Sequence, residues 1–516
     1  MDNKPLETLL LCHLVEENAS TIADHIDAIE TYSGHNVNRV STLGDASQDV
    51  NFEDYDVVVI HYSLILSKNE YVSPMTKLRL RGYNGLKVVL IQDEYRWVNN
   101  TIRMLRFLGI DLLFSCVPQK EIEKVYPRSE LPRLTIKPTL TGFVPSKLLS
   151  IKRPDFHDRD IDVGYRGRKI SAAYGRLAEE KWRIADGFSV VAKRHDLKID
   201  IDYQESARLY GDKWIAFITN CKAMLGAESG ASVFDFEGTI IPAVESAEKE
   251  NNQVTFEELE NKYFPGLDGK IKVNQISPRC FECASLGTLM VLFEGEYSGV
   301  LEPWKHYVPL MKDFSNGDEV INSLKDEKTW TNITTSAFEE IACNPDYSFR
   351  KFAEEFGDSI KEEHKRKKED KDFGLNGQNN EFKDLNYEYI KLAADWQMEP
   401  SLVKYKDLGD AYQHLTGSHQ DLGDAYQDLT GSHQDLGDAY QDLTGTYTFL
   451  TARHKDLVGS YQSLAASYQT VGEENSRLTH ALSPLLSMTI RRLLNVYKYP
   501  YYFRKILSKF SFSEDR

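Results

Sequence analysis

The chain has 516 residues, of which 41% are hydrophobic and 11% aromatic, and its formal net charge is −17 from 62 Lys and Arg against 79 Asp and Glu. This length and composition are typical of a globular protein with two substantial cores and exclude a fibrous or fully disordered chain. Because affinity for phosphate backbones comes largely from clustered Lys and Arg, the acidic balance also predicts no nucleic-acid partner.

The cysteines and the apolar segments indicate the cellular compartment in which the protein is expected. Six cysteines are scattered through apolar segments without the spacing of a disulfide framework, which favours a reducing environment. Cys280 and Cys283 form a lone CxxC, interpreted as two packed thiols and not as a metal or redox site. The first residues do not read as a signal peptide, and no segment is long and apolar enough to span a membrane. We therefore expect a cytoplasmic protein.

From residue 9 to 118 predicted strands and a helix alternate. A parallel, Rossmann-like α/β domain over residues 1–150 is the expected result. A dinucleotide-binding version would need a glycine-rich turn after the first strand, and the residues after Val15 contain no glycine, which disfavours an NAD-dependent enzyme. The expected elements are strands at 9–15, 56–61, 87–92 and 111–116 and a helix at 21–32.

Polar side chains follow two of these strands. His61 ends the second strand, and Asp93 and Glu94 follow the third. The carboxyl ends of strands line the ligand crevice of open α/β sheets. These three residues are therefore the candidates for a catalytic base, and the sequence does not choose among them.

A second Rossmann-like domain is predicted over residues 151–345. Its first strand, Asp160–Tyr165, runs into a basic turn containing Arg166, Arg168 and Lys169. These cations could neutralise a diphosphate, and a solvated basic turn is the alternative. The nearby Asp-x-Asp spacings lie at the start of the strand and not at its carboxyl end, so no metal site is expected.

A glycine-rich segment follows the end of a strand or helix predicted at Met224-Leu225. Such a loop lets backbone N–H groups approach a phosphate or sugar, although ordinary turns often have the same composition. Its candidate donor-binding residues are Gly226, Glu228, Ser229 and Gly230.

The segment 276–310 contains the most informative pattern. Glu282 lies near a predicted helix start, where a carboxylate can accept hydrogen bonds from ribose hydroxyls while the positive helix end attracts a diphosphate. A glutamate favoured only by the helix dipole is the alternative. Leu289–Phe293 then reads as a short buried strand.

The pattern R-x-F-E-x-x-x-x-G from Arg279 to Gly287, followed by a strand, Glu302 and His306-Tyr307, resembles the CgeB-like branch of GT-B glycosyltransferases (glycosyltransferase family 1-like). The resemblance covers roughly residues 5–345. It implies two Rossmann-like domains that close on a nucleoside-diphosphate sugar, with no metal or cofactor, and adds Arg279 to the donor-binding candidates. Many retaining relatives carry Glu-x7-Glu, and Asn274 occupies the first of these positions, so the stereochemical outcome stays open.

The rest of the chain predicts helical segments. Residues 346–400 read as a helical, charged linker with a solvated mixed-charge run at 361–371. Heptads with leucines every seven residues then predict a coiled coil over 401–485 that self-associates, with an open oligomer number. The tip, 486–516, is basic and aromatic up to residue 512, which suits an anionic membrane surface or an acidic protein face.

These patterns predict a glycosyltransferase that transfers a sugar from a nucleoside-diphosphate sugar to a glycan or lipid-linked acceptor, in surface polysaccharide assembly. Two alternatives remain. One is a non-catalytic GT-B-like binding head on an oligomeric scaffold, and the other is a sugar-nucleotide epimerase.

Overall fold

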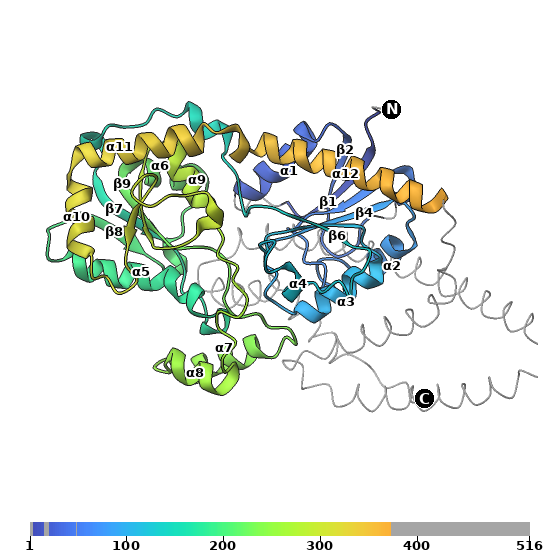
Figure 1. The fold of residues 1–516 in the computed structure, drawn as a ribbon, viewed down its shortest axis with the longest axis horizontal. Coiled ribbons are helices and arrows are strands. Elements are labelled where there is room, and N and C mark those ends of the chain that lie inside the picture. Colours follow the sequence, from blue (N-terminus) through green and yellow to red (C-terminus); the bar gives the residue numbers. More distant parts are fainter. Residues whose placement is uncertain (1–3, 15–19, 48, 373–516) are drawn as a thin grey trace, which may run out of the picture. The chain divides into compact units, whose positions relative to one another are not determined.

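The computed structural model describes residues 4–14, 20–47 and 49–372, which contain two parallel α/β sheets. Figure 1 shows the two sheets with their covering helices. The predicted coiled coil at 401–485 and the basic tip at 486–516 lie outside the described residues. Among the helices that are described, none is both long and apolar enough to cross a bilayer.

The first sheet has six parallel strands in the order β2-β1-β3-β4-β5-β6. Its strands are β1 (Glu7–Cys12), β2 (Asn36–Ser41), β3 (Val57–Ile60), β4 (Leu86–Ile91), β5 (Leu112–Ser115) and β6 (Thr135–Pro138). Its helices are α1 (Ser20–Tyr32), α2 (Pro74–Gly82), α3 (Val98–Leu108) and α4 (Ile122–Val125).

Alternate residues of the central strands face opposite layers of helices, as the two-residue period of a strand requires. Leu9 and Leu11 of β1 belong to the core beneath α2 and α3, whereas Leu10 belongs to the core beneath α1 and α12 (Phe349–Asp372). Continuous apolar runs in β1, β3 and β4 follow from burial on both faces. Edge strand β2 has no fully buried residue, and its polar sequence explains why hydrophobic patterning does not predict it.

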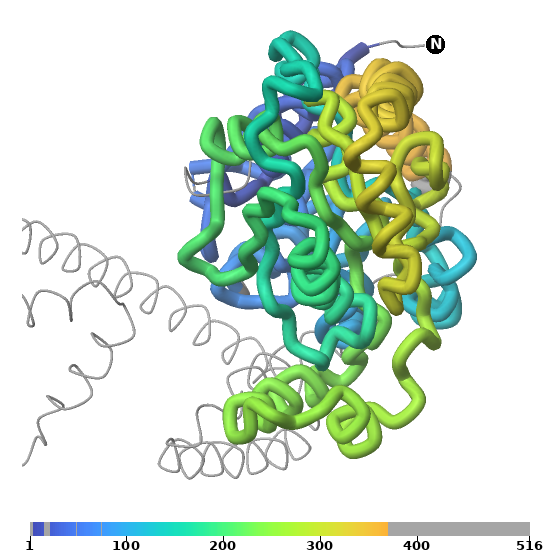
Figure 2. Tube along the Cα trace, turned by 90° about the vertical axis from the view of Figure 1, so that its left-hand side faces the viewer, coloured from blue at the N-terminus to red at the C-terminus, as the bar shows by residue number. Residues whose placement is uncertain are grey.

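The second sheet has five parallel strands in the order β11-β10-β9-β7-β8. Its strands are β7 (Ile161–Arg166), β8 (Ile199–Asp202), β9 (Cys221–Gly226), β10 (Leu289–Phe293) and β11 (Val308–Leu310). Its helices are α5 (Arg176–Ala192), α6 (Gly211–Asn220), α9 (Pro278–Leu286), α10 (Gly317–Lys325) and α11 (Glu327–Ala337). A small lobe of α7 (Ile240–Glu250) and α8 (Phe256–Tyr263) lies beside this domain in both views (Figures 1 and 2).

Helix α12 crosses back to the first domain and packs on its sheet (Figure 1). Phe352, Phe356 and Ile360 are buried there, and Glu363 is buried near the end of the helix. Glu363 accepts a hydrogen bond from Thr135, and Lys367 forms an ion pair of 2.7 Å with Asp111. The charged run at 361–371 therefore belongs to α12, with Glu363 buried and most of its other charged side chains exposed.

Candidate functional site

The carboxyl ends of strands from both sheets meet at a cavity of about 200 Å³, named here the interdomain cavity. The first domain contributes the turn Gln92–Arg96 after β4 and Thr141. The second domain contributes Arg168, Ile170, Tyr174, Ala178, Lys181, Ser229, Gly230, Phe234, Val273, Gln275 and Pro278. Residues far apart in the sequence thus line one cavity between the two domains.

The turn after β4 is fixed by the second domain. The N–H of Asp235 donates to the carbonyl of Tyr95 at 2.9 Å, and the N–H of Val98 donates to the carbonyl of Asp235 at 3.2 Å. The Asp235 carboxylate accepts backbone N–H bonds from Gly238, Thr239 and Ile241, at and just before the start of α7. The turn that contains Asp93 and Glu94 is therefore hydrogen-bonded to a loop of the second domain.

Asp93 and Glu94 are neighbours in very different surroundings. Asp93 is exposed and accepts a hydrogen bond of 2.9 Å from the Tyr95 hydroxyl. Glu94 is 5% exposed and accepts hydrogen bonds from the Ser115 hydroxyl at 2.6 Å, the Cys116 N–H and the Tyr126 hydroxyl, both at 3.0 Å. Burial raises the pKa of Glu94 to about 8, against the opposite effect of these hydrogen bonds. Glu94 therefore holds a proton near neutral pH, whereas Asp93 is the exposed carboxylate on the cavity wall.

His61, the third catalytic candidate, lies in the core of the first domain with no exposed surface. Its Nε2 lies 3.0 Å from Nδ1 of His25, and its Nδ1 lies 2.9 Å from the Ser63 hydroxyl. Burial and the neighbouring His25 hold the pKa of His61 well below its usual range. Because both ring nitrogens are engaged and covered, His61 cannot reach an acceptor hydroxyl in this conformation.

The three basic side chains of the turn after β7 lie in three different surroundings. Arg168 is exposed and lines the cavity. Arg166 is held away from it by an ion pair of 2.9 Å with Asp200 and by the Phe217 ring, 4.3 Å from its guanidinium carbon. Lys169 is exposed, and its Nζ lies 5.1 Å from the centre of the Trp182 ring. Only one of the three predicted cations thus lies on the cavity wall.

Lys181 supplies a second cation to this wall, and the sequence analysis missed it. Its Nζ donates to the carbonyl of Gly230 at 3.4 Å, and burial lowers its pKa to about 8, with Asp93 acting in the opposite direction. Arg279 lies close behind and donates to the carbonyls of Arg166 and Leu225. Lys181 occupies an ordinary position in an amphipathic helix, so no sequence signal separates it from its neighbours.

The glycine-rich segment forms part of the second-domain wall of the cavity. Ser229 and Gln275 exchange two backbone hydrogen bonds of 2.7 and 3.0 Å. Gly230 has φ +102°, and an added Cβ would lie 2.1 Å from the carbonyl oxygen of Val273, so glycine is required there. Ser229 and Gly230 line the cavity.

The surroundings of Gly226 and Glu228 indicate structural roles. A Cβ at Gly226 would lie 2.7 Å from a methyl carbon of Leu292, so the glycine permits close strand packing. Glu228 is 1% exposed and accepts hydrogen bonds of 2.8 Å from the N–H groups of Glu296 and Tyr297. It therefore fixes the loop after β10.

Glu282 lies in the second turn of α9, whose first residue, Pro278, is on the cavity wall. Gly287 ends this helix in the left-handed conformation, φ +63°. The Glu282 carboxylate is 6% exposed, accepts a hydrogen bond of 2.9 Å from Trp214 and has a pKa raised by burial. In this conformation Glu282 is buried beside Trp214 and is not on the wall of the interdomain cavity.

Within the described ranges no group of three or more His, Cys, Asp or Glu side chains is arranged to hold a metal ion. Cys280 and Cys283 are buried, and burial raises the pKa of both thiols.

No family model and no curated protein matches this chain. Similar solved structures include an α-glucosyltransferase in complex with UDP-glucose and DNA containing an abasic site, with 11% identity, a TM-score of 0.43 and coverage of 69% of this chain and 99% of that chain. The DNA-modifying enzyme β-glucosyltransferase has 14% identity, a TM-score of 0.40 and coverage of 69% and 99%. TarM has 10% identity, a TM-score of 0.34 and coverage of 59% and 54%. A likeness this distant does not assign an activity to the chain.

One expectation is corrected by these structures. The net charge of −17 predicts no nucleic-acid partner, yet glucosyltransferases among the similar structures were solved with DNA. The exclusion is therefore withdrawn, because the charge of a local surface and not the net charge decides whether a phosphate backbone is bound.

Proposed function

We propose that this chain is a glycosyltransferase whose donor, a nucleoside-diphosphate sugar, binds at the interdomain cavity. The observation that carries the proposal is the convergence there of Asp93 and Glu94 from one domain with Arg168 and Lys181 from the other. Carboxylates can accept the proton of an attacking hydroxyl, and cations can stabilise a departing diphosphate. The R-x-F-E-x-x-x-x-G pattern at Arg279 supports the same class.

The donor diphosphate is assigned to the second-domain wall. Arg168 and Lys181 provide positive charge, and α9 begins at Pro278 with the positive end of its dipole toward the cavity. The proposal assigns no metal ion to the diphosphate. Glu282 as the partner of the ribose stays a prediction, and it requires the carboxylate to share or exchange its bond with Trp214.

The acceptor is proposed to be a glycan or a lipid-linked glycan, as in surface polysaccharide assembly, and the first domain would present it to Asp93. Inversion and retention both remain open, because Asn274 replaces the first glutamate of the retaining pattern.

A panel of nucleoside-diphosphate sugars, added to the full-length protein, tests the proposal. We expect at least one donor to raise the melting temperature and to release its nucleoside diphosphate when a glycan acceptor is present. Binding without consumption in any acceptor mixture would favour a binding head, and interconversion of the sugar without an acceptor would favour an epimerase.

Changing Arg168 to Ala is expected to weaken donor binding about 10- to 100-fold, because a charge-assisted hydrogen bond to phosphate is worth about 1.5–3 kcal/mol. Lys169→Ala is the matched control, since it removes the same charge from the adjacent exposed residue, and we expect a change below about 2-fold. Isothermal titration calorimetry with the donor found in the panel measures both. Equal losses in the two variants would show that only general electrostatics is involved and would remove Arg168 from the site.

A further inference from the structure

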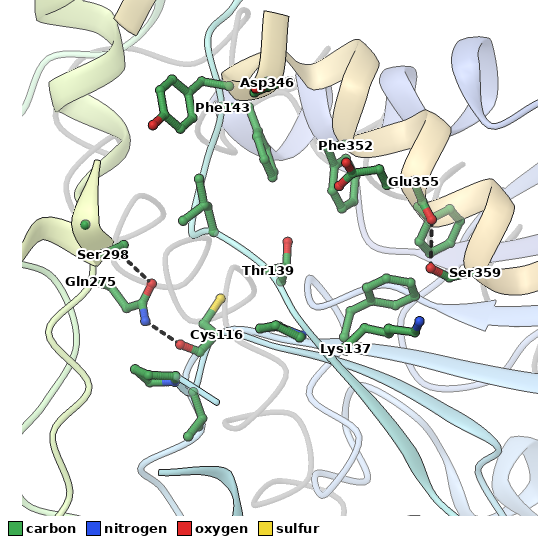
Figure 3. A pocket seen from close by; sticks show the side chains of 18 of the residues that line it. Cys116, Lys137, Thr139, Phe143, Gln275, Ser298, Asp346, Phe352, Glu355 and Ser359 are labelled. Carbon is green, nitrogen blue, oxygen red and sulfur yellow. Dashed lines mark hydrogen bonds between the residues drawn. The ribbon is translucent and has the colours of Figure 1, made fainter. Parts of the chain in front are cut away.

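A second and larger cavity, of about 850 Å³, lies where the chain crosses between the two domains. Residues 137–140 and Phe143 of the first crossing and Asp346 and Tyr347 of the second line it. Helix α12 closes one side, and the second domain contributes Gln275 and Ser298 opposite it (Figure 3). We name it the crossover cavity.

The crossover cavity and the interdomain cavity share one lining residue. Gln275 is 4% exposed and lines both cavities. Its Nε2 donates to the carbonyl of Cys116, and its Oε1 accepts a hydrogen bond of 3.0 Å from the Ser298 hydroxyl. Because this amide is held from both sides, a molecule in the crossover cavity would occupy a site distinct from that of the proposed donor.

Aromatic rings form much of the wall. Phe143 and Phe352 stack with ring centres 4.8 Å apart, and Phe114 and Phe356 lie 4.9 Å apart. A cavity of this volume with aromatic walls and a few polar groups is typical of a small-molecule site. The Thr139 hydroxyl on the wall is covered by its neighbours and has no hydrogen-bond partner within the described part of the chain.

The rim of the crossover cavity is acidic. It carries five carboxylates, and its two lysines are already paired: Lys120 with Glu296 at 3.0 Å and Lys137 with Glu362 at 3.4 Å. Of the other carboxylates, Glu355 pairs with Lys351, whereas no described ion pair involves Asp346 or Asp358. This charge favours cations and disfavours phosphates and carboxylates.

We propose that the crossover cavity binds a small organic cation, an ammonium group carried on an apolar or aromatic body. The body would lie against Phe143 and Phe352, and the ammonium would lie at the rim near Asp358. This site does not depend on the proposed donor site.

Three probes of one shape and different charge test the charge preference on the full-length protein. Phenethylamine is cationic, phenethyl alcohol neutral and 3-phenylpropanoate anionic at pH 7. Titration calorimetry is expected to show binding of phenethylamine at least about 10-fold tighter than that of the other two. Equal binding of the three probes, or binding of none, overturns the proposal.

Two charge-removing substitutions on α12 locate the binding. Asp358→Asn is expected to weaken phenethylamine binding at least about 5-fold, because it removes a rim carboxylate. Glu354→Gln changes the net charge equally on the same helix, but Glu354 pairs with Arg350 at 2.8 Å away from the cavity, and it is expected to have no effect. Ser359→Trp, which fills the cavity from α12, should abolish binding while circular dichroism confirms the fold. Binding unchanged by both Asp358→Asn and Ser359→Trp places the cation elsewhere and overturns the proposal.

Discussion

Asp93→Asn is expected to lower kcat by about 10²-fold or more while donor affinity changes less than about 3-fold, because positioned general bases contribute about 10²–10⁴-fold to rates. Asp93 is the exposed carboxylate on the first-domain wall of the interdomain cavity. Asn keeps its shape but cannot take a proton. Release of nucleoside diphosphate measures kcat, and calorimetry measures donor affinity separately.

The neighbouring carboxylate provides the control for this prediction. With a pKa raised to about 8, Glu94 is already protonated at pH 7, so Glu94→Gln is expected to reduce kcat much less there. Tyr95→Phe removes only the hydrogen bond of 2.9 Å to Asp93 and should have an intermediate effect. If Glu94→Gln abolishes turnover and Asp93→Asn does not, the two roles are reversed.

The difference between these two carboxylates shows what patterning can and cannot predict. The strand predicted at 87–92 is followed by polar residues, and the structure confirms a strand there, since β4 ends at Ile91. It does not reveal which carboxylate is buried. That depends on Ser115 from β5 and Tyr126 after α4, which reach Glu94 only after the sheet has formed.

Glu282 shows the same limit at the other wall. The sequence places Glu282 near a helix start, but in the structure it is the fifth residue of the nine-residue α9 and lies at the middle of the helix. Its partner Trp214 comes from α6, 68 residues earlier, and covers the carboxylate. Exposure of a side chain is a property of packing between elements, so local spacing does not determine it.

The buried His25–His61 pair is expected to make the protein lose stability as the pH falls below about 6.5. Burial lowers the pKa of His25 to about 3 and holds that of His61 well below its usual value. In the unfolded chain both would titrate near pH 6.5. Below that pH the unfolded state therefore binds more protons than the native state, and the free energy of unfolding falls.

The magnitude follows from linkage. Each histidine that stays neutral in the native state lowers the free energy of unfolding by about 1.4 kcal/mol per pH unit once the unfolded state is protonated. Between pH 6.5 and 5 the two histidines together therefore lower it by about 3 kcal/mol. The stability they contribute is fully present above about pH 7.5. Guanidinium unfolding of the full-length protein, followed by tryptophan fluorescence at several pH values, measures it.

His25→Phe is expected to halve this loss while retaining an aromatic ring. The His25 ring centre lies 4.3 Å from that of Phe352 on α12, so a phenyl ring fits the same apolar surroundings. His195→Gln is the control, because His195 lies outside the pair and contacts Asp318 at 2.7 Å. Carboxylates that titrate over the same range are common to all variants, so they cancel when the profiles are subtracted. If the free energy of unfolding of the wild type and of His25→Phe depends on pH in the same way, His25 titrates alike in the native and the unfolded state. The packing of α1 against α12 then does not depend on a neutral imidazole.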